Sequence, residues 1–241
     1  MAPDFSDRPH VLVAGSDLPR PGQFAAIAFA LLATLIVLSS IGVALVGQGS
    51  SPLVSTFHRA VYVDHERNLT TFFNFSLMTV NVVLLAMATS RAARTGSSRR
   101  WHWLILGATF LLLSFDEAAQ LHERLNAPVK AALDLDGPFA FAWVVPGIAF
   151  VATFAATFVR FLRSLPPPVA LRMVLGGAVY VGGAIGAEMV GAAIGADDVA
   201  QRATIGYVAA TTTEEAMEMS GLILFASALL AHLRGPAGRS G

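Results

Sequence analysis

The sequence LLLSFDEAAQLHERL, residues 111–125, joins an apolar helical segment directly to acidic residues and a histidine. Asp116 and Glu117 come first, and His122 and Glu123 follow within two helical turns. Carboxylates and an imidazole close together can bind a metal ion or transfer protons. Ionisable side chains in an apolar environment are costly and usually functional, so this segment is the first candidate for a site.

Three carboxylates on three predicted helices lie at the same depth. Each is sixteen residues from an arginine at a predicted helix end: Asp116 from Arg100, Glu188 from Arg172 and Glu218 from Arg234. At a rise of ~1.5 Å per residue this spacing corresponds to ~24 Å, in the far part of a hydrocarbon layer ~30 Å thick. The sequence therefore predicts an acidic site in one half of the protein.

The acidic site has no basic partner inside the apolar segments. Protons or a cation must therefore balance the negative charge. Oxygen ligands with one imidazole suit Zn, Mn, Fe or Mg, and the absence of cysteine excludes thiolate ligands. We expect a divalent metal ion as cofactor, with the ligands Asp116, His122, Glu188, Glu218, Glu123 and Glu66. Glu117 or Glu215 is expected to act as the catalytic general base.

Several of these residues also have structural explanations. If the last helix begins near Thr211, Glu214 and Glu215 are acids of its first turn, where the helix dipole favours negative charge. The segment 122–124 can be the solvated end of a helix, and 64–67 can be a hydrophilic loop that precedes one.

Familiar catalytic motifs are absent from the sequence. There is no HExxH motif of zinc proteases and no Glu-x-x-His pair of di-iron proteins. The glycine-rich segment 176–195 follows no predicted strand, so it is expected to serve helix packing and not nucleotide binding.

The composition is that of an all-α membrane protein. Of 241 residues, 55% are hydrophobic and 13% are charged, and the mean hydropathy is +0.63. The formal net charge is zero and no large basic surface is expected, which excludes nucleic acid as a partner. Apolar runs long enough to cross a membrane predict a bundle of six transmembrane helices, at roughly 22–46, 69–90, 101–123, 139–162, 170–195 and 207–233.

The arginines predict the orientation of this polytopic bundle. They concentrate in the loop RAARTGSSRR, in the loop around residues 160–172 and in the C-terminal tail, which places both termini in the cytoplasm. Residues 1–20 and 235–241 are expected to be disordered cytoplasmic tails on either side of a transmembrane domain at 21–234.

Two sequence patterns predict how the helices pack. The fifth helix, GGAVYVGGAIGAEMVGAAIG, has small residues at helical spacing, which let a neighbouring backbone come close and favour a place at the centre of the bundle. Thr70, Asn74 and Asn81 form a polar stripe on the second helix that can donate neutral hydrogen bonds to the site. Trp143 is most simply an anchor at the membrane interface or a core residue.

The motif SFDEAAQLHERL, followed later by TTTEEAMEMSG, resembles a group of uncharacterised small multi-pass bacterial membrane proteins. The resemblance implies the same acidic cluster and a bacterial inner membrane location. DHERN followed by FFNFS is more weakly similar to alkaline-ceramidase-like membrane hydrolases. Those enzymes have a His-x-x-x-His pair on a late helix, and this sequence has none.

These observations predict an integral membrane protein with a metal-binding carboxylate and histidine site in its extracytoplasmic half. The site would activate water against a lipidic substrate, which makes membrane lipid the expected partner. Two alternatives use the same acids. They can carry protons or cations in a transporter or channel, or pair with basic residues of a larger complex in which the chain is a small structural subunit.

Overall fold

The computed structural model describes residues 17–49, 51–65, 67–195, 199–202 and 204–235, and this part of the chain contains helices and no strand. Most of the two predicted tails lies outside these residues. The helices, in chain order, are α1 (Pro21–Gln48), α2 (Pro52–Val61), α3 (Leu69–Arg94), α4 (Arg100–Ala119), α5 (Leu121–Leu133), η2 (Gly137–Phe139), α6 (Val144–Arg163), α7 (Pro167–Val181), η3 (Gly182–Ala187), α8 (Glu188–Gly195), α9 (Val199–Arg202) and α10 (Ile205–Arg234).

The described residues form five helices long and apolar enough to cross a membrane, with α7, η3 and α8 together making one of them. A sixth is present if α4 and α5 form one bent span. The all-α class and the several long apolar helices predicted from the sequence are thus confirmed. The predicted third helix, 101–123, is not continuous, because α4 ends at Ala119 and the chain bends by 80° between α4 and α5.

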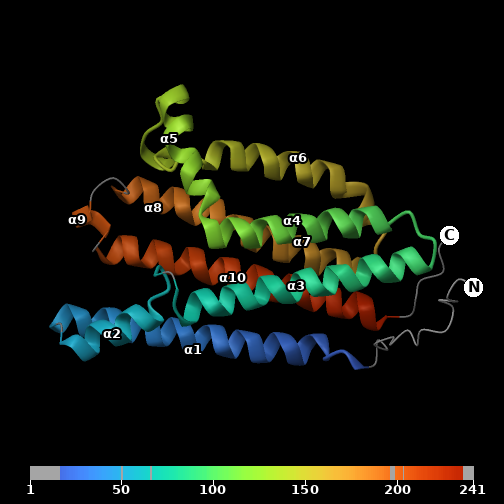
Figure 1. Ribbon diagram of the computed structural model, residues 1–241, viewed down its shortest axis with the longest axis horizontal. Coiled ribbons are helices and arrows are strands. Elements are labelled where there is room, and N and C mark those ends of the chain that lie inside the picture. The colour runs from blue at the N-terminus through green and yellow to red at the C-terminus, as the bar shows by residue number, and fades with distance from the viewer. Residues whose placement is uncertain (1–16, 50, 66, 196–198, 203, 236–241) are drawn as a thin grey trace, which may run out of the picture.

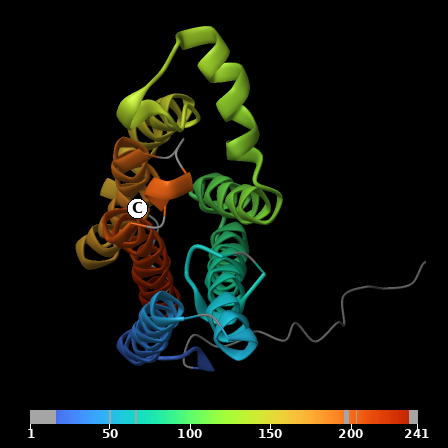
Figure 2. The same ribbon diagram turned by 90° about the vertical axis from the view of Figure 1, so that its left-hand side faces the viewer.

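Helix α10 lies at the centre of the bundle (Figures 1 and 2). It packs against α1, α3, α7, η3 and α8, while α4 packs against α3 and α6 against α7. The half of α10 after Met219 is buried on nearly every face. The central place predicted for the fifth helix is therefore wrong. Its small residues instead let α10 come close to it.

Glycines set the close contact between α7 and α10. A Cβ atom built on Gly221 would lie 2.6 Å from the carbonyl oxygen of Gly176, and one built on Gly176 would lie 2.9 Å from that of Gly221. Real Cβ contacts are essentially never that short. The two helix backbones therefore touch where glycine removes both side chains, as expected for helix packing in membranes.

The segment η3 is a six-residue stretch of π-helix between α7 and α8. Its sequence, GGAIGA, contains three glycines, whose conformational freedom allows the wider turn. A π-helical insertion shifts the side chains that follow it around the helix axis, and such insertions are frequent at functional sites. Glu188 is the first residue after this one.

The apolar core fills the end of the bundle that holds the start of α1 and the end of α10 (Figure 1). Trp103, Leu229 and Leu230 are among its most buried residues. Arg91 closes this end by donating hydrogen bonds from its guanidinium to the carbonyl groups of His232, Leu233 and Gly235, at 3.1, 2.7 and 2.7 Å. The helix dipole also stabilises a cation at a helix C-terminus.

Candidate binding cavity

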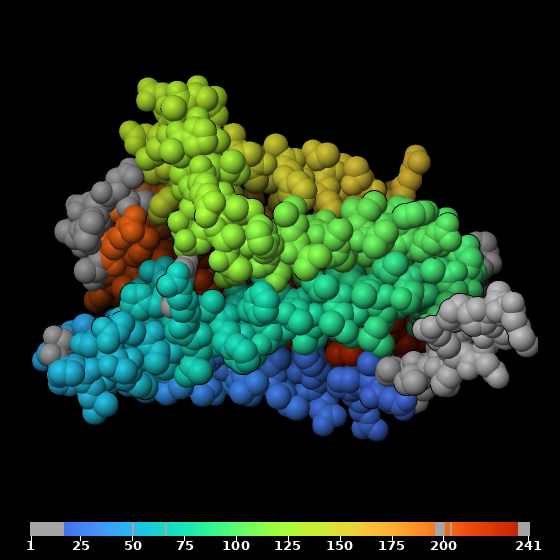
Figure 3. Space-filling view, viewed as in Figure 1, coloured from blue at the N-terminus to red at the C-terminus, as the bar shows by residue number. Residues whose placement is uncertain are grey.

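A cavity of about 1460 Å³ begins at the other end of the bundle and reaches into the apolar core, because Phe158, Met173 and Phe225 belong to both. Its walls come from α3, α4, α6, α7, η3, α8, α10 and the first turns of α5, and the segment between α2 and α3 reaches one end of it. Helix α5 turns away from the bundle at this end and projects from the molecular surface (Figure 3).

One end of the cavity is strongly acidic. The described lining contains eight carboxyl groups but three arginines, two histidines and no lysine. The acids are Asp64, Asp116, Glu117, Glu123, Glu188, Glu214, Glu215 and Glu218. With ionised carboxyls and neutral histidines, this lining would have a negative excess charge, so bound protons or cations must supply part of the balance.

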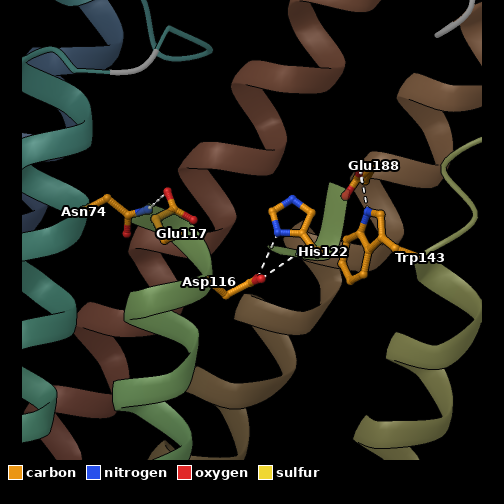
Figure 4. Close-up of polar contacts among 6 residues, drawn as sticks. All are labelled: Asn74, Asp116, Glu117, His122, Trp143 and Glu188. Atoms are coloured by element: carbon orange, nitrogen blue, oxygen red, sulfur yellow. Dashed lines mark hydrogen bonds and ion pairs between the residues drawn. The ribbon is translucent and has the colours of Figure 1, made fainter. Parts of the chain in front are cut away.

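Asp116 and His122 form a pair across the break between α4 and α5 (Figure 4). One carboxylate oxygen of Asp116 accepts the backbone N–H of His122 at 2.8 Å, and the other lies 2.8 Å from its Nδ1. Gln120 between them has φ 50° and ψ 47°, the left-handed region that ends a helix. The aspartate thus satisfies a free N–H at the start of α5, where the helix dipole favours an anion.

Trp143 connects this pair to the opposite wall of the cavity (Figure 4). Its indole Nε1–H donates to Glu188 at 2.9 Å, and its ring centroid lies 4.9 Å from that of His122. Its backbone N–H donates to the side chain of Asn126 in α5 at 3.0 Å. Gly147 leaves space for the indole, since a Cβ there would lie 2.9 Å from the ring. Trp143 therefore holds α5 and α8 together.

Glu117 accepts a hydrogen bond from the buried Asn74 of α3 at 3.0 Å (Figure 4). The side-chain oxygen of Asn74 is buried without a hydrogen-bond partner among the described residues. Thr70 and Asn81, predicted on the same stripe, are also fully buried, and Asn81 donates to the carbonyl of Leu222 in α10 at 3.1 Å. The polar stripe thus faces the protein interior, as its spacing predicts.

Helix α10 carries three of the acids well inside its length. Its cap is Thr204, whose hydroxyl accepts the N–H of Tyr207. The explanation of Glu214 and Glu215 as first-turn acids near Thr211 is therefore wrong, because the helix begins six residues earlier, at Ile205. Gly183 of η3 lies directly against the backbone carbonyl of Glu214 and the side chain of Glu218, so the Glu218 side chain faces the π-helical segment.

Asp64 lines the acidic end from the segment between α2 and α3. The pKa of Asp64 is raised from its ordinary value, first because the surrounding protein keeps water away from the carboxylate. The charge of Glu123 raises this pKa further, whereas His65 and Arg202 lower it. Protons therefore bind this end of the cavity more readily than they bind a carboxylate in water.

Seven of the eight predicted site residues line this one cavity: Asp116, Glu117, His122, Glu123, Glu188, Glu215 and Glu218. Glu66 lies outside the described residues. Among those that are described, no three histidine, aspartate or glutamate side chains come close enough to hold a metal ion. The geometry thus brings the residues to one cavity without giving support to a divalent metal site, and their individual roles stay predictions.

The opposite end of the cavity is apolar. Helix α6 contributes Phe150, Phe154 and Phe158, and the ring centroids of successive residues are 5.7 and 4.4 Å apart. Leu106 and Phe110 of α4 complete this part of the wall, together with residues of α7. The cavity therefore joins an acidic end to an aromatic and aliphatic end.

Sequence reasoning did not assign Trp143, Asn126, Tyr180 and Tyr207 to the site, although all four line the cavity. Each has an uncharged polar group and lies within or beside an apolar segment. That pattern is also typical of residues at a membrane interface, so it does not separate the two roles. A buried indole N–H or phenol requires a hydrogen-bond partner, and this requirement could have indicated that the tryptophan and the tyrosines lie near polar side chains.

Residues 25–233 match a protein family described as a domain of unknown function (DUF8692). The chain belongs to this family. The match covers most of the sequence and agrees with the resemblance to an uncharacterised family, but it shows no similarity to ceramidases. No curated protein and no solved structure matches the chain.

Proposed function

We propose that the protein crosses the membrane six times, with α4 and α5 as one bent span and both termini in the cytoplasm. The positive-inside rule supports this orientation. Arg91, Arg94, Arg99 and Arg100 lie at the end of the bundle where α1 begins and α10 ends, and Arg234 of α10 donates a hydrogen bond to Leu18 just before α1. The acidic end of the cavity then opens toward the outside.

Within this membrane domain, the cavity binds a positively charged ligand from the outer side. The observation that carries this proposal is the excess of eight carboxyl groups over three guanidinium groups around one cavity. Carboxylates in a low-dielectric site attract a cation more strongly than they would in water. A neutral ligand would leave this balance to bound protons alone, and an anionic ligand would add to the negative charge.

The fold around the cavity favours a transporter over the metal-dependent hydrolase that the sequence predicts. The carboxylates of Asp116 and Glu188 are already engaged by His122 and Trp143, which leaves them poorly placed to act together as ligands of one metal ion. Two helices are interrupted beside the acids, α4 at Gln120 and α7 at the π-helical segment. Interrupted helices whose ends lie beside a polar cavity are a feature of many transporters.

Binding of a small cation to the purified protein in nanodiscs tests this proposal. Butylamine, which is protonated at neutral pH, should raise the unfolding temperature, whereas butanol and butyrate should not. By mass action, ligand at 100 times its Kd stabilises the folded state by roughly 2.7 kcal/mol. A second readout is the fluorescence of Trp143, with Trp143→Phe as the blank, because this indole contacts both Glu188 and His122.

Charge removal at the cavity provides the matched comparison. Glu218→Gln and Glu215→Gln should weaken butylamine binding, because each removes a carboxylate from the cavity wall. Asp134→Asn is the control, since Asp134 is an exposed residue that does not line the cavity and its left-handed backbone also suits asparagine. Equal stabilisation by butylamine and butyrate, or unchanged binding in both glutamine variants, would overturn the proposed function.

A further inference from the structure

We infer that the natural ligand is an amphipathic amine with a long hydrocarbon chain, its ammonium group against the acids and its chain along α6. This inference rests on the proposed cation binding and adds the chemical class of the ligand. A small inorganic cation would need the acidic end alone. The cavity extends well beyond that end, and the extension is what the chain would occupy.

The apolar part of the cavity has the form of a channel parallel to the helices. Phe150, Phe154 and Phe158 are spaced by four residues, so they lie along one face of α6. Between Phe150 and Leu162, both of which line the cavity, the helix rises by ~18 Å. On α4 the lining runs from Asp116 to Leu106, a rise of ~15 Å.

The volume agrees with this elongated form. Binding pockets for drug-sized molecules are commonly ~300 to 1,000 Å³, and this cavity measures about 1460 Å³. Helix α7 leaves the space open, since a Cβ atom on Gly177 would have no neighbour within 4 Å. The neighbouring Gly176 is in contact with α10 instead, so the two glycines of α7 have different roles.

Charge and shape together identify the ligand class. The acidic end excludes a fatty acid or an alkyl phosphate, because their head groups would add to the excess negative charge. The apolar end offers nothing to a hydrophilic cation such as a free polyamine, whose further charges would lie against phenylalanine rings. One positive head group, together with bound protons, satisfies the acidic end of the cavity, and one long apolar chain satisfies the other end.

A large side chain at Gly177 tests the position of the hydrocarbon chain without touching the acids. Gly177→Phe should fill the apolar end, so that dodecylamine binds roughly tenfold or more weakly while butylamine binds unchanged. This estimate assumes that the new side chain keeps two or more methylene groups of the ligand out of the cavity. Each methylene that stays in water raises the Kd about fourfold. Gly47→Phe is the control, because a Cβ on Gly47 is also in open space and the residue does not line the cavity.

Ala155→Phe repeats the test from α6 if Gly177→Phe does not fold, since Ala155 is an exposed residue on the same cavity wall. A selective loss of dodecylamine binding in either variant supports the inference. If both variants bind dodecylamine as the unmodified protein does, the ligand class is wrong but cation binding stands. If neither amine binds, or dodecanol binds as tightly as dodecylamine, the proposed function itself is wrong.

Discussion

The substitution Gly221→Ala tests the backbone contact that forms one wall of the cavity. An added Cβ would lie 2.6 Å from the carbonyl oxygen of Gly176, 2.6 Å from the backbone nitrogen of Tyr180 and 2.7 Å from the Cβ of Tyr180. Two of these three atoms belong to the backbone of α7, so a rotation of one flexible side chain cannot relieve the overlap. Helices α7 and α10 must move apart.

Two opposing effects set the size of the change in stability. Overpacking in a tight core costs about 1 to 3 kcal/mol. Alanine is favoured over glycine inside a helix by up to about 1 kcal/mol, which offsets part of this cost. We therefore expect Gly221→Ala to lower the free energy of unfolding by about 1 to 2 kcal/mol. In a chain of this length that corresponds to a fall of roughly 2 to 8 °C in Tm.

Gly177→Ala is the matched control, because it makes the same chemical change on α7 in open space. It should leave Tm unchanged or raise it slightly, through the helix propensity of alanine. Thermal unfolding of both variants in the same nanodiscs, followed by tryptophan fluorescence, measures the difference. If Gly221→Ala proves as stable as Gly177→Ala, α7 and α10 do not touch at their glycines, and the wall of the cavity is misplaced.

Three further substitutions test the site and the orientation. Glu188→Gln keeps a hydrogen-bond acceptor for Trp143, so this variant should fold stably but bind butylamine weakly. Glu188→Leu should in addition lower the free energy of unfolding by about 1 to 3 kcal/mol, because the indole N–H loses its partner. Equal unfolding temperatures of the two variants would show that the hydrogen bond is unimportant. Asp116→Ala should free the start of α5 and speed proteolysis there, because it removes both carboxylate oxygens that hold the backbone N–H and the Nδ1 of His122. An unchanged cleavage rate would argue against this link. Ser98→Cys in this cysteine-free chain should resist a membrane-impermeant thiol reagent in intact cells but react after lysis, and labelling in intact cells would reverse the proposed topology.

Most of the long apolar helices could be predicted from the sequence, because crossing a hydrocarbon layer requires about twenty apolar residues. Predicted segments 22–46, 69–90 and 207–233 agree closely with α1, α3 and α10. The break at Gln120 could not be predicted in the same way. Neither glycine nor proline marks it, and it depends on a carboxylate that accepts an N–H from the following helix.

The convergence of three acids on one cavity could be predicted, but rotation about each helix axis could not. Equal spacing from an arginine placed Asp116, Glu188 and Glu218 at one level, and all three line the same cavity. The π-helical segment before Glu188 turns that residue relative to a regular helix, which a count at 3.6 residues per turn cannot include. For this reason a shared level did not imply a shared metal ion.

The prediction that the fifth helix lies at the centre of the bundle is wrong because a helix rich in small residues need not be a buried helix. Glycine in α7 and η3 indicates that another backbone comes close, but it does not say which of the two helices is surrounded. Helix α10 is surrounded because its apolar side chains occupy nearly every face after Met219. It nonetheless carries Glu214, Glu215 and Glu218 in its first half, where the cavity replaces packed side chains. The acids lie where the core ends, and this arrangement allows one helix to be both the central packing element and a wall of the binding site.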